Sequence, residues 1–142
     1  MKPTLLNPYL SFAGNCREAL TFYQSCLGGE LNLQAFADSP MGEQLPEEAR
    51  QGIMHGCLST GALTLMASDA GCMQEKLSPG NAVSLCLNCG SDEEIRAVFH
   101  KLSEGGTVVD PLADMFWGAT FGTLTDKYGM SWLLNYDKSA AN

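Results

Sequence analysis

The sequence predicts an α+β fold built from two βαβββ modules. Each half of the chain holds one amphipathic helical segment between a cap and a pair of glycines, and this segment follows one strand-like run and precedes three more. A module by itself would leave one face of its sheet uncovered. Two modules side by side would form one curved mixed sheet, with the helices on its outer face and an internal cleft.

The first helical segment is predicted over Cys16–Leu27. Asn15 can cap it, and Glu18 follows three residues later, as in a variant of the capping box. Apolar residues recur at helical spacing and form one face, namely Cys16, Ala19, Leu20, Tyr23 and Leu27. The pair Gly28–Gly29 then ends the helix, because glycine accepts the left-handed stop conformation.

The second half of the chain repeats this pattern. Ser91 and Glu94 form a complete capping box, and Gly105–Gly106 stops the helix. The apolar face between them consists of Ile95, Val98, Phe99 and Leu102. The separation between the two predicted caps is almost the same as that between the two glycine pairs, which indicates an internal repeat.

Strand-like runs complete both modules. They are Tyr9–Phe12, Glu30–Ala37, Ile53–Ser59 and Ala62–Ala67 in the first module, and Val83–Leu87, a run beginning at Thr107–Val109, Phe116–Leu124 and Met130–Tyr136 in the second. We therefore expect a single domain over residues 1–142, with modules at about 4–69 and 82–137 and a linker at 70–81. Residues 38–52 form an acidic insertion, in which Pro46–Arg50 predicts one helical turn.

Composition excludes several classes of partner. The net charge is −8, from 8 Lys and Arg against 16 Asp and Glu, and the sequence has no basic stripe, so we expect neither nucleic-acid nor membrane-surface binding. The apolar runs are too short to span a bilayer, and residues 1–8 hold no signal core. Six cysteines then indicate reduced thiols and a cytoplasmic protein rather than a disulfide framework.

Several local strings point to a known family. They are Asn7–Phe12, Gly14–Cys16, Ala19 with Phe22–Tyr23, His55, Ser68–Asp69, Phe116–Gly118, Phe121–Gly122, Thr125–Gly129, Trp132 and Asn135. Over nearly the whole chain, these strings resemble the PhnB-like branch of the vicinal-oxygen-chelate superfamily. The C-terminal strings are the more specific part of the resemblance, because the helical segments are generic.

The resemblance implies a fold without deciding a function. The superfamily includes glyoxalase I, extradiol dioxygenases, fosfomycin-modifying enzymes and bleomycin-sequestering proteins, so whether this chain is an enzyme stays open. The PhnB-like branch is also labelled demethylubiquinone-methyltransferase-like, but the sequence has no Gly-rich strand–turn–helix loop for a nucleotide-like cofactor. We predict no cofactor. The resemblance implies a homodimer, in agreement with the need to cover edge strands.

The usual metal site of the superfamily is predicted to be absent. Metal-dependent members use His and Glu side chains from the first and last strands of each half, and flanking residues match these positions to Pro8, Leu65, Ser84 and Leu133. None of the four is a good ligand for a divalent metal, although Ser84 could contact a substrate. A divalent metal is expected only under an alternative hypothesis, in which a non-standard site is built around His55 and Asp69.

His55 is the one histidine expected on a strand, and it could be a general base, a metal ligand or a hydrogen-bonded structural or pocket residue. Asp69 could orient its imidazole across a hairpin, although both Asp69 and Asp126 are typical of turn hydrogen bonds. His55 and Asp69 are the catalytic candidates. His100, beside Lys101 and off the apolar helix face, is predicted to be exposed.

On the last predicted strand, the alternation of side chains separates residues of the core from residues of the cleft. Trp132, Leu134 and Tyr136 share an apolar face that should pack under the helices, whereas Ser131, Leu133 and Asn135 share the mixed face that should look into the cleft. An apolar cleft with a few polar groups is typical of a small-molecule site. The ligand-binding candidates are Tyr9, Ser84, Trp117, Phe121 and Asn135, with Trp117 expected to begin its strand.

Cys86 and Cys89 have C-x-x-C spacing, but on a strand this spacing sends the two thiols to opposite faces. We therefore expect neither a redox motif nor a zinc site there. The other cysteines are interpreted as small buried or loop residues, namely Cys16, Cys26, Cys57 and Cys72.

The sequence leaves three hypotheses about function open. The first is a protein of this superfamily that binds a small, partly apolar molecule in its cleft without the usual metal site. The second is a metal-dependent lyase or transferase of the glyoxalase type, using His55 and Asp69. The third is a structural or regulatory dimer without a ligand.

Overall fold

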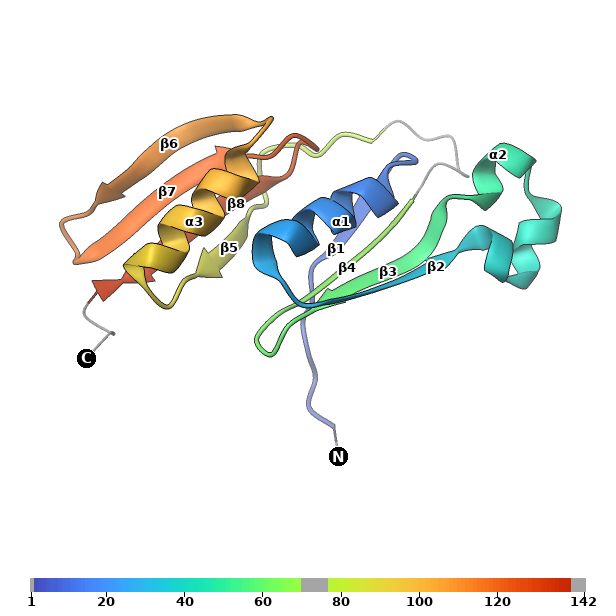
Figure 1. The fold of residues 1–142 in the computed structure, drawn as a ribbon, viewed down its shortest axis with the longest axis horizontal. Coiled ribbons are helices and arrows are strands. Elements are labelled where there is room, and N and C mark those ends of the chain that lie inside the picture. Colours follow the sequence, from blue (N-terminus) through green and yellow to red (C-terminus); the bar gives the residue numbers. More distant parts are fainter. Residues whose placement is uncertain (1, 70–76, 139–142) are drawn as a thin grey trace. The chain divides into compact units, whose positions relative to one another are not determined.

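The computed structural model describes residues 2–69 and 77–138, and it contains both predicted modules (Figure 1). The chain divides into two compact units, residues 1–78 and 79–142, which we call unit 1 and unit 2. Each predicted module forms a unit by itself. Most of the predicted linker, together with Cys72, lies outside the described residues.

Unit 1 is a four-stranded mixed sheet with one long helix. Its elements are β1 (Tyr9–Phe12), α1 (Cys16–Leu27), β2 (Glu30–Ala35), η1 (Phe36–Asp38), η2 (Pro40–Gln44), α2 (Glu47–Arg50), β3 (Ile53–Ser59) and β4 (Thr64–Asp69). The strand order is β1-β4-β3-β2, with β1 parallel to β4 and the other pairs antiparallel. The predicted bounds of β1, α1 and β3 are confirmed, and the predicted helical turn of the insertion is α2.

Unit 2 has the same topology. Its elements are β5 (Leu85–Asn88), α3 (Asp92–Ser103), β6 (Thr107–Asp114), β7 (Ala119–Thr125) and β8 (Ser131–Asp137). The strand order is β5-β8-β7-β6, and again only the first pair is parallel. The α+β class and the βαβββ repeat are confirmed. The strands form two four-stranded sheets, one in each unit, where the sequence predicted one curved sheet.

Four strands begin later than predicted, namely β4, β5, β7 and β8, and the difference is largest for β7. Phe116 and Trp117 belong to the turn between β6 and β7, and β7 starts only at Ala119. The backbone N–H of Gly118 donates to the carbonyl of Met115 at 3.1 Å, and Gly118 has a φ of +91°. A left-handed residue at this place closes the turn, so Trp117 lies before the strand and does not begin it.

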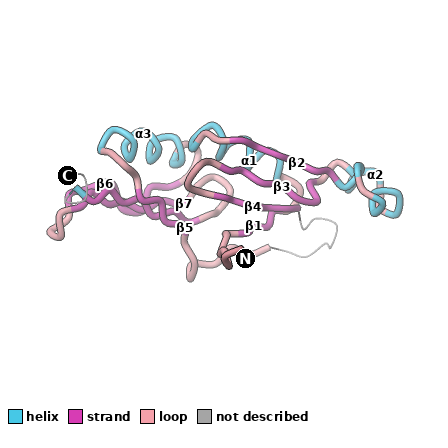
Figure 2. The backbone as a smooth tube through the Cα atoms, turned by 90° about the horizontal axis from the view of Figure 1, so that it is seen from below, coloured by secondary structure: helices cyan, strands magenta, loops and turns pink. Residues whose placement is uncertain are grey.

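In each unit the long helix covers one face of the sheet (Figure 2). A glycine on a central strand lets the helix approach. A Cβ at Gly56 would lie 2.5 Å from Cδ1 of Leu20 on α1, and a Cβ at Gly122 would lie 2.9 Å from Cε2 of Phe99 on α3. The core forms between helix and sheet, and Trp132, only 2% exposed, belongs to it as predicted.

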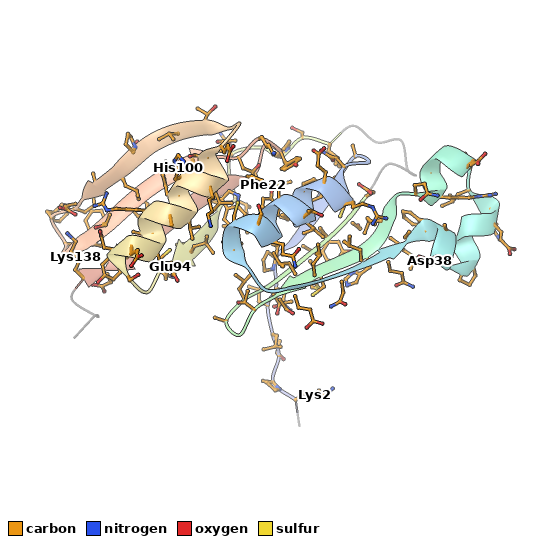
Figure 3. All side chains as sticks on the ribbon, viewed as in Figure 1. Lys2, Phe22, Asp38, Glu94, His100 and Lys138 are labelled. Carbon is orange, nitrogen blue, oxygen red and sulfur yellow. The ribbon has the colours of Figure 1, made fainter. Side chains whose placement is uncertain are left out.

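The two long helices begin differently. The Ser91 hydroxyl accepts the Glu94 N–H at 3.1 Å, and the Glu94 carboxylate accepts the Gly90 N–H at 3.0 Å, so the predicted capping box is confirmed. Glu94 and His100 lie toward opposite ends of α3 (Figure 3), and His100 is exposed as predicted. At α1, Asn15 stands at the N-cap but its side chain makes no capping hydrogen bond.

Asp69 replaces Asn15 as the cap of α1, which corrects the prediction. One carboxylate oxygen of Asp69 accepts the N–H groups of Gly14 and Cys16, at 2.8 and 2.9 Å. A carboxylate is favoured there over an amide because the N-terminal end of a helix carries a partial positive charge. Within the described residues, no helix is long and apolar enough to cross a membrane.

Candidate functional site

Each sheet has one face that its own helix does not cover, and we call it the helix-free face. In unit 1, β4 shows the alternation clearly: Leu65, Ala67 and Asp69 are buried, whereas Met66 and Ser68 between them are partly exposed. The strand register places Tyr9 and Cys57 on either side of Met66. Side chains on the helix-free face of unit 1 therefore include Tyr9, Met66 and Cys57.

Two predicted site residues meet on this face. The Tyr9 hydroxyl and Nδ1 of His55 are 3.4 Å apart, and their ring centroids are separated by 5.9 Å with the planes tilted by 36°. Both side chains are exposed, Tyr9 by 50%. Tyr9 reaches across β4, which lies between β1 and β3. The contact joins Tyr9, which was predicted to bind a ligand, to His55, which was predicted to be catalytic.

Asp69 does not join them. It is 5% exposed and lies on the helix-covered face, while His55 is exposed on the opposite face. Besides capping α1, Asp69 accepts the N–H of Ile53 at 2.8 Å through its second carboxylate oxygen. The two oxygens of Asp69 together accept the backbone N–H groups of three residues, Gly14, Cys16 and Ile53. The structure does not bring the predicted pair of His55 and Asp69 together, because alternation on β4 turns Asp69 toward the helix.

The helix-free face of unit 2 carries the remaining predicted ligand-binding residues. Gly122, Leu124, Trp132 and Leu134 are buried beneath α3, so the residues between them on β7 and β8 face the other way. Three cross-strand rows follow from the register and one hydrogen bond: Ser84, Ser131 and Thr125; Cys86, Leu133 and Thr123; Asn88, Asn135 and Phe121.

Polar side chains on this face are paired. The hydroxyls of Ser84 and Ser131 are 2.7 Å apart. Nδ2 of Asn135 donates to Oδ1 of Asn88 at 3.2 Å. Sequence reasoning named Ser84 and Asn135 and missed Asn88 as a site residue. Its position became apparent only from the parallel register of β5 and β8, which a single sequence does not reveal.

Aromatic side chains adjoin the amide pair. Phe121 is the direct cross-strand partner of Asn135. Its ring lies 6.3 Å from that of Trp117 in an edge-on arrangement, and Trp117 in turn meets Phe116 at 5.0 Å. Trp117 is 53% exposed and Phe116 is 97% exposed. The face therefore ends in an exposed aromatic group next to two amides.

The four residues that the sequence match assigns to the usual metal positions do not fit a divalent metal. Pro8 has no side-chain donor atom, and Leu65 is buried on the helix-covered face. The hydroxyl of Ser84 is hydrogen-bonded to Ser131, and Leu133 is apolar. Across residues 2–69 and 77–138, no group of three His, Cys, Asp or Glu side chains gathers in a way that could hold a metal ion.

The start of α1 does not fit a nucleotide-like cofactor either. Such a cofactor would place an anionic group at the N–H groups that begin the first helix after a strand. In this chain the Asp69 carboxylate already binds the N–H groups of Gly14 and Cys16 there. An added anionic group would have to displace a buried carboxylate.

Two cysteines are poor nucleophiles. Burial, followed by the negative charge of Asp69, raises the pKa of Cys16 to about 12. Burial and the neighbouring Glu94 raise the pKa of Cys89 to about 11, so both thiols stay protonated at neutral pH. Cys86 and Cys89 are free thiols, and Cys89 follows the end of β5. Because Cys89 lies beyond the strand, the spacing argument, which placed both thiols on one strand, does not apply to this pair.

Comparison with known proteins gives the family. Residues 4–135 match the family model described as 3-demethylubiquinone-9 3-methyltransferase. The chain is 34% identical to Protein YjdN of Escherichia coli (strain K12) over 145 residues, which cover 94% of this chain and 95% of that protein. The solved structure of protein PA1353 from Pseudomonas aeruginosa is 39% identical, with a TM-score of 0.84 and coverage of 95% of this chain and 98% of that one.

A second solved structure carries the same family description. It is a PhnB protein from Bacillus cereus, a putative 3-demethylubiquinone-9 3-methyltransferase, 28% identical with a TM-score of 0.70, covering 94% of this chain and 99% of that one. A glyoxalase/bleomycin resistance protein/dioxygenase from Nocardioides, at 18% identity and a TM-score of 0.59, shares the fold over 96% of this chain and 84% of its own. The chain therefore belongs to the family described as 3-demethylubiquinone-9 3-methyltransferase, as the PhnB protein is described, and it shares the fold of the glyoxalase/bleomycin resistance/dioxygenase protein.

Proposed function

We propose that this protein binds a small molecule with a flat apolar ring and a polar substituent, without the metal site usual in its superfamily. The observation that carries the proposal is the pairing of Phe121 with Asn135 on the helix-free face of unit 2. This pair places an aromatic ring directly beside an amide, and each member has a partner of its own kind, Trp117 and Asn88.

The chemistry of this face suits such a ligand. Aromatic rings favour offset or edge-on contacts with another ring, which Trp117 and Phe121 can provide. Asn135 and Asn88 use one donor and one acceptor on each other, which leaves the Asn135 carbonyl and the Asn88 amino group to bind a ligand. The Ser84 and Ser131 hydroxyls offer further polar contacts along the face.

The family description itself names a ring compound, a demethylubiquinone. A flat ring with oxygen substituents is the kind of molecule that an aromatic and amide face would accept. We propose this ligand class without the methyl transfer, because the start of α1 is already bound by Asp69. The Tyr9 and His55 contact on unit 1 is a second place where a ring lies beside a hydrogen-bonding group.

Trp117 makes the proposal testable. A neutral nitroaromatic amide, 4-nitrobenzamide, quenches indole fluorescence on contact. We expect saturable quenching of Trp117 in the wild-type protein, weakened at least tenfold in apparent affinity by Asn135→Ala and by Phe121→Ala. Asn32→Ala is the matched control, because Asn32 is also a strand asparagine that is not buried, but it lies in unit 1. Quenching that rises linearly without saturation, or equal effects of Asn135→Ala and Asn32→Ala, would contradict the proposal.

We also propose that the protein is a cytoplasmic homodimer. The five cysteines in the described part of the chain are free thiols, which suits a reducing compartment. The edge strand β6 exposes two apolar side chains, Val108 by 42% and Val109 by 59%, which a second copy of the chain would cover. Sedimentation equilibrium at micromolar concentration should give twice the chain mass of 15.2 kDa, and a monomer would count against the dimer.

A further inference from the structure

We propose that His55, Cys57 and Met66 on the helix-free face of unit 1 bind a soft monovalent metal ion, Cu(I). The three side chains lie on one face of adjacent strands, β3 and β4. They combine an imidazole, a thiol and a thioether. This site is distinct from the positions that the superfamily uses for divalent metals, which in this chain fall at Pro8, Leu65, Ser84 and Leu133.

The register brings the two sulfur atoms within reach of one ion. Cys57 and Met66 are direct cross-strand partners in an antiparallel pair, so their Cβ atoms lie roughly 5 Å apart. A metal–sulfur bond of about 2.3 Å on each side can bridge this gap. Met66 is unbranched and can adapt its side chain to the position of the ion.

His55 approaches the same point from along the strand. It stands two residues before Cys57 on β3, which puts it on the same face at roughly 7 Å along the chain. An imidazole is long enough to reach back over this distance toward Cys57. His55 is exposed, and Cys57 and Met66 are partly exposed, so an ion can enter from solvent.

Tyr9 orients the imidazole for this role. Metal-binding histidines commonly donate their second ring N–H to an oxygen atom, which fixes the ring and its tautomer. The Tyr9 hydroxyl oxygen lies 3.4 Å from Nδ1 of His55. With the proton on Nδ1 directed to Tyr9, the lone pair of Nε2 is left for the metal.

The ligand set selects the ion. Thiolate and thioether ligands favour Cu(I), whereas Ca²⁺, Mg²⁺ and Mn²⁺ prefer carboxylate and carbonyl oxygens, which this trio lacks. Binding replaces the thiol proton of Cys57 by the metal, so one proton is released to solvent for each Cu(I) bound, and no oxidation or reduction occurs. The site is also open to Ag(I), which has the same preference for sulfur.

The test is anaerobic Cu(I) titration of tag-free, reduced protein against a chromogenic Cu(I) chelator, bicinchoninate. We expect one Cu(I) per chain that resists the chelator, and at least a tenfold loss of affinity in Cys57→Ser, Met66→Leu and His55→Ala. Two matched controls should keep wild-type affinity. They are Cys86→Ser, which removes an exposed strand thiol in unit 2, and Met54→Leu, which removes a thioether on the same strand β3.

X-ray absorption at the copper edge gives an independent readout. We expect a three-coordinate Cu(I) with sulfur and nitrogen ligands in the wild type, and loss of one sulfur in Met66→Leu. Binding that survives Cys57→Ser and disappears in Cys86→Ser would overturn the proposal, as would the absence of a chelator-resistant ion. Asn135→Ala, which removes the ring-binding face of unit 2, should leave Cu(I) binding unchanged, so the two proposals fail or succeed separately.

Discussion

The indole Nε1 of Trp132 donates to a carboxylate oxygen of Asp126 at 2.8 Å, and both residues are buried. The other oxygen of Asp126 accepts the N–H groups of Tyr128 and Met130, at 2.8 and 3.1 Å. Asp126 thereby fastens the turn that leads into β8, much as Asp69 fastens the end of β4 to the start of α1. Each unit uses one buried aspartate to hold the strand that passes through its centre.

Trp132→Phe tests the first of these anchors. The change removes one hydrogen bond to a buried carboxylate and part of a buried ring, so we expect a loss of about 2 kcal/mol in the free energy of unfolding. Urea unfolding followed by circular dichroism measures it. Trp117→Phe is the natural control, since Trp117 is half exposed in a turn and should cost less than about 0.5 kcal/mol. Equal losses in the two variants would contradict the assigned role of Trp132.

Asp69→Ala tests the second anchor. It leaves the N–H groups of Gly14, Cys16 and Ile53 without their acceptor, and each buried donor left unsatisfied costs about 1–3 kcal/mol. We expect at least about 3 kcal/mol of destabilisation by urea unfolding. Ser68→Ala, one residue earlier on the same strand but on the helix-free face, should be nearly neutral. A small effect of Asp69→Ala on the free energy of unfolding would contradict this structural role and would make Asp69 a candidate catalytic residue again.

Replacing the N-cap residue by alanine should lower the free energy of unfolding at the start of α3 but hardly change it at the start of α1. Ser91→Ala removes a side-chain cap and should cost about 1 kcal/mol. Asn15→Ala removes no capping hydrogen bond and should change the free energy of unfolding by less than about 0.5 kcal/mol. Thermal or urea unfolding of both variants measures the difference. A larger loss for Asn15→Ala than for Ser91→Ala would contradict the capping by Asp69.

Cys16 should make stability depend on pH in the alkaline range. Burial and the charge of Asp69 raise its pKa from 9.0 to about 12, so the folded state keeps a thiol proton that the unfolded state loses first. Its contribution is complete below pH 9 and is lost as the pH rises toward 12, with a slope of about 1.4 kcal/mol per pH unit for one proton. Cys16→Ala should flatten the decline of unfolding free energy between pH 9 and pH 11. An unchanged slope would contradict the assignment.

Local signals in the sequence predicted much of the fold. The periodicity and stop glycines of Cys16–Leu27 predicted α1 to the residue, and alternation on β8 predicted that Trp132 is buried and Asn135 is not. These features depend on neighbours in the chain. The late start of β7 was missed because the turn at Gly118 follows aromatic residues, Phe116 and Trp117, that are typical of strands.

The site was less predictable because it depends on register between distant strands. Sequence reasoning paired His55 with Asp69, whereas the structure pairs His55 with Tyr9 across β4. Asn15 was a reasonable cap by type, but its side chain makes no capping hydrogen bond, and a carboxylate from the end of β4 accepts the N–H groups of Gly14 and Cys16 instead. Neither contact leaves a signal in a single sequence, because the partners are 46 and 53 residues apart.

The most direct test of the central claim is a two-dimensional amide and side-chain NMR titration with a panel of small neutral aromatic compounds bearing one hydrogen-bonding group. We expect saturable shifts that cluster on Phe121, Asn135, Asn88 and the Trp117 indole, and that disappear in Asn135→Ala while persisting in Asn32→Ala. Shifts confined to other surfaces, or the absence of any saturable shift at millimolar concentration across the panel, would contradict a ring-binding face in this protein.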